Sequence, residues 1–178
     1  MSITICTYNV HSLKDSQGRD NVDRIVEFLN KEKPDVLCLQ EISGYGRRQL
    51  QPMLGYKNGF SWAACSILTN LPLERVQIPN EKYQRGYHPR FLTVKLALGK
   101  EEIYLTCCHL DYKDEPRRMS EMRKLEDYLR DQFEARVPQI WTGDFNSLTR
   151  EDYTDQEWEE VSQVRRKNRW ELPKTEVI

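Results

Sequence analysis

The chain is 178 residues long, a length that suits one domain with a sizeable buried core. Its 27 basic and 28 acidic residues leave a net charge of −1, which argues against disorder and against holding nucleic acid by bulk charge alone. No apolar run reaches the roughly 18 residues that span a bilayer, and the N-terminus lacks a signal-peptide pattern. We expect an intracellular protein, cytoplasmic or nuclear, without a membrane span.

The first part of the chain predicts a strand, a helix and a second strand. Residues 3–8 alternate in side-chain character, which is typical of a strand, and this strand delivers Asn9 at its end. Apolar residues at helical spacing predict a helix over 22–29. The continuous apolar run 36–39 is too short for a helix and predicts a strand buried on both faces, ending in Gln40 and Glu41.

The middle of the chain is expected to be mostly β-structure. Glycines and arginines over 44–48 indicate a loop that could face a ligand. Strands are predicted around 60–69, 91–98 and 103–108, where apolar and β-branched residues gather.

The last part predicts a long helix, a short strand and a final helix. Pro116 opens a helix, and residues 139–142 predict a strand. One face of this helix is expected to be apolar, with Met119, Met122, Leu125, Leu129 and Phe133. Thr154 and Glu157 have the spacing of a capping box. The helix that follows is expected to carry Trp158, Val161 and Val164.

Strands interleaved with helices indicate an α/β sandwich in which helices cover mixed sheets. The five cysteines lie in apolar or β-rich segments and are expected to be small buried side chains. In such folds ligands bind where strands end, so the polar residues at those ends are the candidates for function.

Five such residues stand out: Asn9 in TYNV, Glu41 in LCLQE, His109 in CCHLD, and Asp144 and Asn146 in TGDFN. Each alone is more often a solvated charge, a helix cap or a structural side chain. Together they could build a site for a hard cation, because magnesium prefers oxygen ligands and is typically held by one or two carboxylates. Hydrolysis of a phosphate ester needs a positioned water and stabilised phosphoryl oxygens, which these groups can supply.

The order and spacing of TYNV, LQE, HLD and GDFN over residues 3–148 resemble the endonuclease/exonuclease/phosphatase superfamily. The resemblance implies a four-layer α/β sandwich with two packed mixed sheets. It also implies cleavage of phosphate esters, which in this family occur in DNA, RNA, inositol lipids, sphingomyelin and tyrosyl-DNA adducts. Family membership therefore leaves the substrate open.

The same resemblance implies a role for each motif residue. Glu41 would bind Mg²⁺, with Mn²⁺ as an alternative ion, and Asn9 would lie beside the metal and the phosphate. Asp144 would orient or deprotonate the attacking water, and Asn146 would contact the phosphoryl oxygens. His109 matches the family histidine that lies beside the phosphate in deoxyribonuclease-like members.

Other polar residues have weaker assignments. Arg90 precedes a strand where some relatives place a phosphate-contacting arginine, and an ordinary surface ion pair is an equal alternative. His11 departs from the nuclease pattern and is expected to be a loop side chain. Arg47, Arg48 and the basic residues at 165–169 are expected on solvated surfaces, although the first two could meet a polyanion.

The family's final Ser-Asp-His motif has no counterpart in the sequence. We therefore expect a single domain over 1–178 without its C-terminal strands, an incomplete second sheet, and weak activity from this chain alone. The leading hypothesis is a magnesium-dependent phosphoesterase that uses water as nucleophile, with a slight preference for nucleic acid over lipid or small-molecule substrates. The alternatives are a non-catalytic binding module and an inactive fragment that keeps the fold, and no protein partner can be named.

Overall fold

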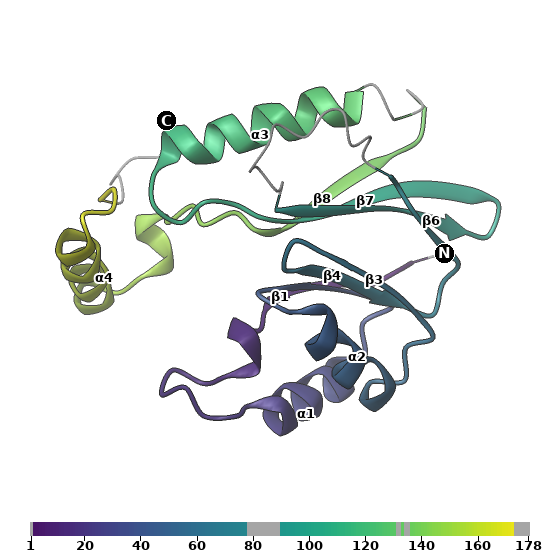
Figure 1. Ribbon diagram of the computed structural model, residues 1–178, viewed down its shortest axis with the longest axis horizontal. Helices are drawn as coiled ribbons and strands as arrows, with labels where there is room; N and C mark the ends of the chain where they lie inside the picture. Colours follow the sequence, from purple (N-terminus) through teal and green to yellow (C-terminus); the bar gives the residue numbers. More distant parts are fainter. Residues whose placement is uncertain (1, 78–89, 131–132, 134–135, 173–178) are drawn as a thin grey trace. The chain divides into compact units, whose positions relative to one another are not determined.

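The computed structural model describes residues 2–77, 90–130, 133 and 136–172. The chain divides into two compact units, Met1–His109 with Asp131–Asp144, and Leu110–Arg130 with Phe145–Ile178. The first unit contains both β-sheets and the helices α1 and α2, and the second contains α3 and α4 (Figure 1). A single family-type domain over 1–178 stays a prediction.

The first sheet has four strands in the order β1-β2-β4-β3. Its strands are β1 (Ile5–Asn9), β2 (Val36–Gln40), β3 (Asn58–Trp62) and β4 (Cys65–Thr69). The pair β1 and β2 is parallel, so Asn9 and Gln40 lie opposite each other at the carboxyl ends of their strands. The antiparallel hairpin of β3 and β4 turns at Ala63 and Ala64, near the same end, because Gln40 pairs with Cys65.

The second sheet also has four strands, in the order β5-β6-β7-β8. Its strands are β5 (Leu73–Arg75), β6 (Phe91–Leu98), β7 (Glu101–His109) and β8 (Gln139–Asp144). The only parallel pair in it among the described residues is β7 with β8, whose register places His109 opposite Asp144. Both sheets are therefore mixed, as the resemblance implied.

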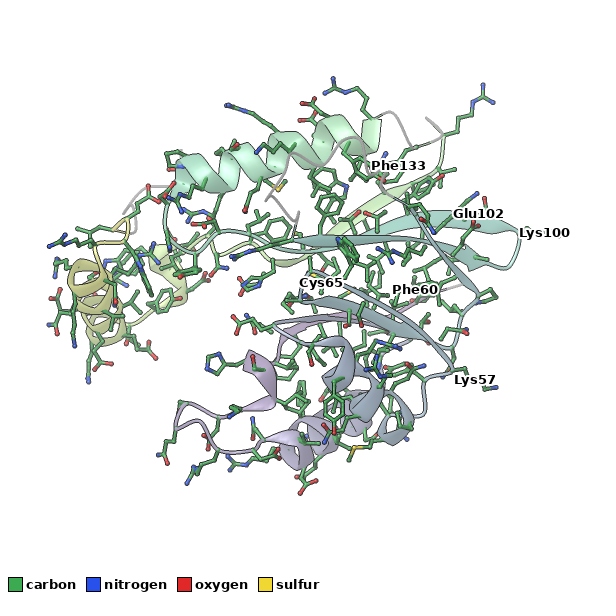
Figure 2. The ribbon with its side chains drawn as sticks, in the orientation of Figure 1. Lys57, Phe60, Cys65, Lys100, Glu102 and Phe133 are labelled. Carbon is green, nitrogen blue, oxygen red and sulfur yellow. The ribbon has the colours of Figure 1, made fainter. Side chains whose placement is uncertain are left out.

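The two sheets face each other across an apolar core, with Cys65 between them in Figure 2. Val36 and Cys38 of β2 pack in the same cluster as Leu105 and Cys107 of β7. The five residues of β2 are all buried, which confirms the strand with two covered faces that the apolar run predicts.

The outer face of the first sheet is covered by α1 (Val22–Glu32) and α2 (Gly44–Met53), as Figure 1 shows. Ile25 and Leu29 of α1 are buried in one cluster with Leu37 and Leu39, the residues of β2 that point away from the other sheet. Successive side chains of β2 therefore point alternately into the apolar core between the sheets and into the one beneath the helices.

The loop predicted over 44–48 is wrong, because these residues begin α2. Ser43 caps the helix by accepting a hydrogen bond from the Gly46 amide at 3.0 Å, and Leu50 is fully buried. Glycine at 46 reflects close packing: a Cβ there would lie 3.1 Å from Ile42 and 3.2 Å from Leu13. A glycine required for packing therefore had the appearance of a loop signal.

The second unit contains α3 (Glu115–Arg130), the short η3 (Arg150–Asp152) and α4 (Asp155–Asn168). The Thr154–Glu157 capping box is confirmed, with both reciprocal hydrogen bonds present. On α4, Val164 is 52% exposed, while Ser162 and Arg165 are buried.

Arg165 also corrects the expectation of a solvated basic surface over 165–169. Its guanidinium donates hydrogen bonds to the backbone carbonyls of Tyr112 at 3.1 Å, Lys113 at 3.2 Å and Glu171. Glu171 in turn pairs with Arg118 of α3 at 3.1 Å. Arg165 therefore ties the end of α4 to the segment that precedes α3.

The long helix also differs from its predicted extent. It ends at Arg130, so Phe133 lies outside it and instead stacks on Tyr104, with ring centroids 4.0 Å apart. Met119, expected on the apolar face, is 46% exposed. In the part of the chain that the structure describes, no helix is both long and apolar enough to span a bilayer.

Candidate active site

Asn9, at the end of β1, joins the two acidic candidates. Its side-chain Nδ2 donates hydrogen bonds to Glu41 Oε1 at 3.0 Å and to Asp144 Oδ2 at 2.9 Å. Its Oδ1 accepts a hydrogen bond from the His11 amide at 3.0 Å. Because a backbone N–H can only donate, this contact fixes which way round the Asn9 amide lies.

Glu41 follows the last residue of β2 and has a positive φ of 54°. A left-handed backbone costs a non-glycine residue roughly 1–2 kcal/mol, so the surrounding contacts must maintain it. One of these contacts is the hydrogen bond from the Ser12 amide to the Glu41 carbonyl at 2.9 Å. The bend ends the strand, so the carboxylate lies at the carboxyl end of β2.

His109 and Asp144 end the parallel strands β7 and β8 and are register partners. The His109 Nε2 lies 3.7 Å from Glu41 Oε1 and 3.8 Å from Asp144 Oδ2. These distances exceed a hydrogen bond but lie within the range of an ion pair, so the imidazole lies beside both carboxylates. Four predicted site residues, including Asn9, are thus gathered at one end of the two sheets.

Gly143 explains how β8 comes close enough to β7 at this point. Its φ is 136°, and a Cβ at this position would lie 2.0 Å from the Cys108 carbonyl oxygen and 2.7 Å from the Cys108 nitrogen. No side chain fits there without moving the backbone. The glycine in TGDFN therefore has a packing role directly before the candidate Asp144.

Gln40 is a buried residue that the sequence reasoning treated only as the end of a strand. Its Nε2 lies 3.1 Å from Thr7 Oγ1, 3.3 Å from the Cys38 carbonyl and 3.1 Å from Cys107 Sγ. Since Cys107 belongs to the other sheet, this side chain connects the two sheets next to Glu41. The sequence signal for this role is a polar amide at the end of an apolar strand, directly before the candidate ligand Glu41.

His11, which the sequence predicts only as a loop side chain, lies beside Glu41. Its Nδ1 lies 3.3 Å from Glu41 Oε2, the carboxylate oxygen that Asn9 does not contact. The side chain is 70% exposed, so this contact borders solvent. Nothing in the local pattern indicated it, because it depends on the turn of consecutive positive-φ residues at 11–13.

A pocket of about 760 Å³ opens beside these residues. Glu41, His109 and Arg90 contribute to its wall, together with Ser12, Ile42, Ser43, Gly44, Ser61, Trp62, Ala63 and Ala64. The Arg90 carbonyl accepts a hydrogen bond from the His109 amide at 2.8 Å, which holds the arginine beside the site. The structure thus brings Arg90 to the same pocket as two of the other candidates.

Asn146 lies in the second unit, just after β8, with a φ of 50°. Its Nδ2 donates a hydrogen bond to the Leu110 carbonyl at 2.9 Å. The contact to phosphoryl oxygens implied by the resemblance stays a prediction.

The donor types suit a hard divalent cation. Glu41 and Asp144 offer carboxylate oxygens that converge on one amide, and magnesium needs only one or two carboxylates because it retains several waters. Over residues 2–77, 90–130, 133 and 136–172, no group of three or more His, Cys, Asp or Glu side chains has the arrangement of a metal site. The two carboxylates fit an ion that keeps several of its waters.

Solved structures with the same fold come from several organisms. A conserved protein of unknown function from Enterococcus faecalis V583 is 18% identical, with a TM-score of 0.62 over 81% of this chain and 67% of its own. A truncated TDP2 from Caenorhabditis elegans is 16% identical, with a TM-score of 0.62 over 85% of this chain and 65% of its own. Beta toxin from Staphylococcus aureus is 13% identical, with a TM-score of 0.64 over 82% and 66%.

At these identities the likeness shows the fold alone. This chain spans between about half and two thirds of the length of these and related solved structures. No curated protein sequence matches it. Residues 6–160 match the model of the Endonuclease/Exonuclease/phosphatase family, which comprises metal-dependent nucleases and phosphoesterases. Because this match covers most of the chain, the protein belongs to the Endonuclease/Exonuclease/phosphatase family.

Proposed function

We propose that this protein is a magnesium-dependent phosphoesterase that hydrolyses phosphodiester or phosphomonoester bonds by direct attack of water. The convergence of Glu41 and Asp144 on the Asn9 amide, with His109 Nε2 within 3.8 Å of both, carries the proposal. Two carboxylates held this close repel each other, and a bound cation would relieve that repulsion. Family membership supports the same reaction class.

In this proposal Glu41 is the principal ligand of Mg²⁺, with Mn²⁺ as the alternative. When bound, the ion would neutralise charge that develops on the phosphoryl oxygens. Asp144 accepts a hydrogen bond from the attacking water and takes its proton as the oxygen–phosphorus bond forms. His109 donates to a phosphoryl oxygen, and Asn9 holds the two carboxylates in place.

Arg90 binds the substrate phosphate from the wall of the pocket. Its planar guanidinium can donate two parallel hydrogen bonds to phosphate oxygens, which fixes orientation as well as charge. The ester bond to the leaving group breaks, and the released alkoxide takes a proton from solvent. No covalent intermediate forms on the protein.

The test compares Mg²⁺-dependent hydrolysis of bis-p-nitrophenyl phosphate and a labelled oligonucleotide by the wild type, Asp144→Asn and Glu41→Gln. We expect Asp144→Asn to lower kcat by roughly 100-fold or more, as for a lost general base. Calorimetry should show that Glu41→Gln weakens Mg²⁺ binding by about tenfold or more.

The matched control is Glu102→Gln, which removes an exposed carboxylate that pairs with Lys95. Equal Mg²⁺ affinity in Glu41→Gln and Glu102→Gln would contradict the proposed ligand. Mg²⁺ and phosphate-ester binding without any turnover by the wild type would instead favour a non-catalytic binding module.

A further inference from the structure

Two aromatic side chains border adjoining pockets around the candidate active site. We infer that Trp62 and Tyr45 are stacking platforms for the bases of a single-stranded nucleic acid, so that the strand runs from the larger pocket, which contains Glu41 and His109, into the smaller one. This inference rests on the proposed phosphoesterase function and names its substrate class.

The two pockets are neighbours in the first unit. The larger, about 760 Å³, contains Trp62, and the smaller, about 220 Å³, contains Tyr45. Ser12, Ile42 and Ser43 belong to the walls of both. A ligand that fills both pockets must therefore pass over the segment that follows Glu41, as an extended chain would.

The indole ring of Trp62 is contacted by a cationic side chain. The guanidinium carbon of Arg75 lies 4.7 Å from its ring centroid, a cation–π contact. Arg75 belongs to β5 and takes no part in the wall of either pocket. The ring is therefore held by a residue outside the pocket, which reduces the entropy lost when a base stacks on it.

Tyr45 is exposed in a way that packing does not explain. It lies in the first turn of α2 and is 73% exposed, more than any other large apolar side chain in the described residues. Phe28 on α1 offers a contrast, because it is 46% exposed and packs edge-on against Tyr8 at 5.7 Å. A solvated aromatic ring at the edge of a pocket offers a free face for a base.

Cationic side chains lie in the walls of both pockets. Arg90 is in the wall of the larger pocket and Lys14 in that of the smaller. The Arg48 Nη1 lies 3.6 Å from the position that a Cβ on Gly44 would take, and Gly44 also belongs to the larger pocket. Proteins hold single strands with aromatic groups that stack on the bases and basic groups that neutralise the backbone.

A lipid substrate fits this surface less well. Of the large apolar side chains exposed in the described part of the chain, only Tyr45 borders either pocket. An acyl chain would therefore find no continuous apolar surface beside the site.

The test measures binding of a fluorescein-labelled eight-residue oligothymidylate, and of an abasic strand with the same phosphates, to the Asp144→Asn protein. Tyr45→Ala, added to this background, should weaken oligothymidylate binding roughly five- to 150-fold, the effect of one lost base stack. It should leave abasic-strand binding unchanged. Phe28→Ala is the matched control, because it removes a partly exposed ring that borders neither pocket.

Trp62→Leu should weaken oligothymidylate binding to a similar degree, and a thermal midpoint checks that this variant is folded. Tyr45→Ala needs no such check, because Tyr45 is exposed. Equal affinity for normal and abasic strands, or equal effects of Tyr45→Ala and Phe28→Ala, would overturn the inference. Binding to sphingomyelin vesicles that Tyr45→Ala abolishes, with oligonucleotide binding unaffected, would overturn it in favour of a lipid.

The failure of the inference and that of the proposed function can be told apart with bis-p-nitrophenyl phosphate, which has no nucleobase. Base-dependent binding without hydrolysis of this diester by the wild type would support the nucleic-acid surface and remove the proposed catalysis. Hydrolysis of the diester together with base-independent binding would support the proposed catalysis and remove the nucleic-acid surface.

Discussion

The Asn9 Nδ2 lies 2.9 Å from the Asp144 Oδ2, although 135 positions separate the two residues. The same NH₂ group donates to Glu41 Oε1, so one neutral amide supports two carboxylates from different sheets. Each of its two hydrogens is used, and its oxygen is bound by the His11 amide. Asn9 is therefore the residue whose loss should separate the acidic groups.

Replacement of Asn9 should cost stability and reveal the cation site. Asn9→Ala removes two hydrogen bonds to charged groups and should lower the free energy of unfolding by about 1–3 kcal/mol. Asn9→Asp should cost more, because it adds a third carboxylate. Urea unfolding with and without Mg²⁺ measures both effects, and Mg²⁺ should restore more stability to Asn9→Asp than to Asn9→Ala. Wild-type stability for Asn9→Asp in metal-free buffer would refute this account.

Gly143→Ala should be strongly destabilising, because its Cβ would stand 2.0 Å from the Cys108 carbonyl oxygen. We expect a loss of about 3 kcal/mol or more in urea unfolding, together with loss of activity as Asp144 shifts. Gly99→Ala is the matched control: its φ is 71°, but no atom lies within 4 Å of the added Cβ. It should cost only about 1–2 kcal/mol, the conformational part alone. Equal losses at the two glycines would rule out the steric explanation.

Two adjacent arginines should respond to alanine substitution with losses of very different size. Arg165 is 8% exposed and donates to three backbone carbonyls, so Arg165→Ala should lower the free energy of unfolding by about 2–3 kcal/mol. Arg166 is exposed and makes one surface ion pair with Glu159, so Arg166→Ala should change it by about 0.5 kcal/mol or less. Thermal and urea unfolding compare the two variants, and similar losses would contradict the buried network.

Tyr56 should make stability fall at high pH. Its hydroxyl donates to the Pro34 carbonyl at 2.7 Å, and burial, together with the nearby Cys6 and Asp35, raises the pKa of Tyr56 to about 12. Since the folded pKa is above the ordinary value of 10.0, the stabilising contribution is complete below pH 10 and is lost as pH rises towards 12. Urea unfolding at several pH values should show a smaller decline over this range in Tyr56→Phe. Parallel curves for the two proteins would exclude this linkage.

Most strands were predictable because the determining pattern is local. The apolar run at 36–39 and the alternation that begins near Ile5 define β2 and β1 without reference to the rest of the chain. The strand predicted over 91–98 has the bounds of β6. The motif order also predicted which residues end neighbouring strands, and the structure brings Asn9, Glu41, His109 and Asp144 together.

The failures involve interactions between distant segments. The helix α2 was missed because a glycine in the sequence resembles a loop signal. Gly46 is instead needed for packing, since a side chain there would crowd Leu13 and Ile42. Arg165 resembled a surface cation because its carbonyl partners near Tyr112 lie about 50 positions away. The contact of His11 with Glu41 depends on a turn of three positive-φ residues, and no residue type specifies such a turn.

The hairpin of β6 and β7 separates the two ends of the second sheet. Its turn at Gly99 and Lys100 joins Leu98 to Glu101, whereas His109 ends the same β7 strand eight residues later. Figure 2 shows Lys100 at the tip of this hairpin. Extended strands rise about 3.3 Å per residue, so the tip lies roughly 25 Å from the end of β7 that carries the candidate active site. A fluorophore or affinity tag inserted at this tip would report on the protein without entering the path of its substrate.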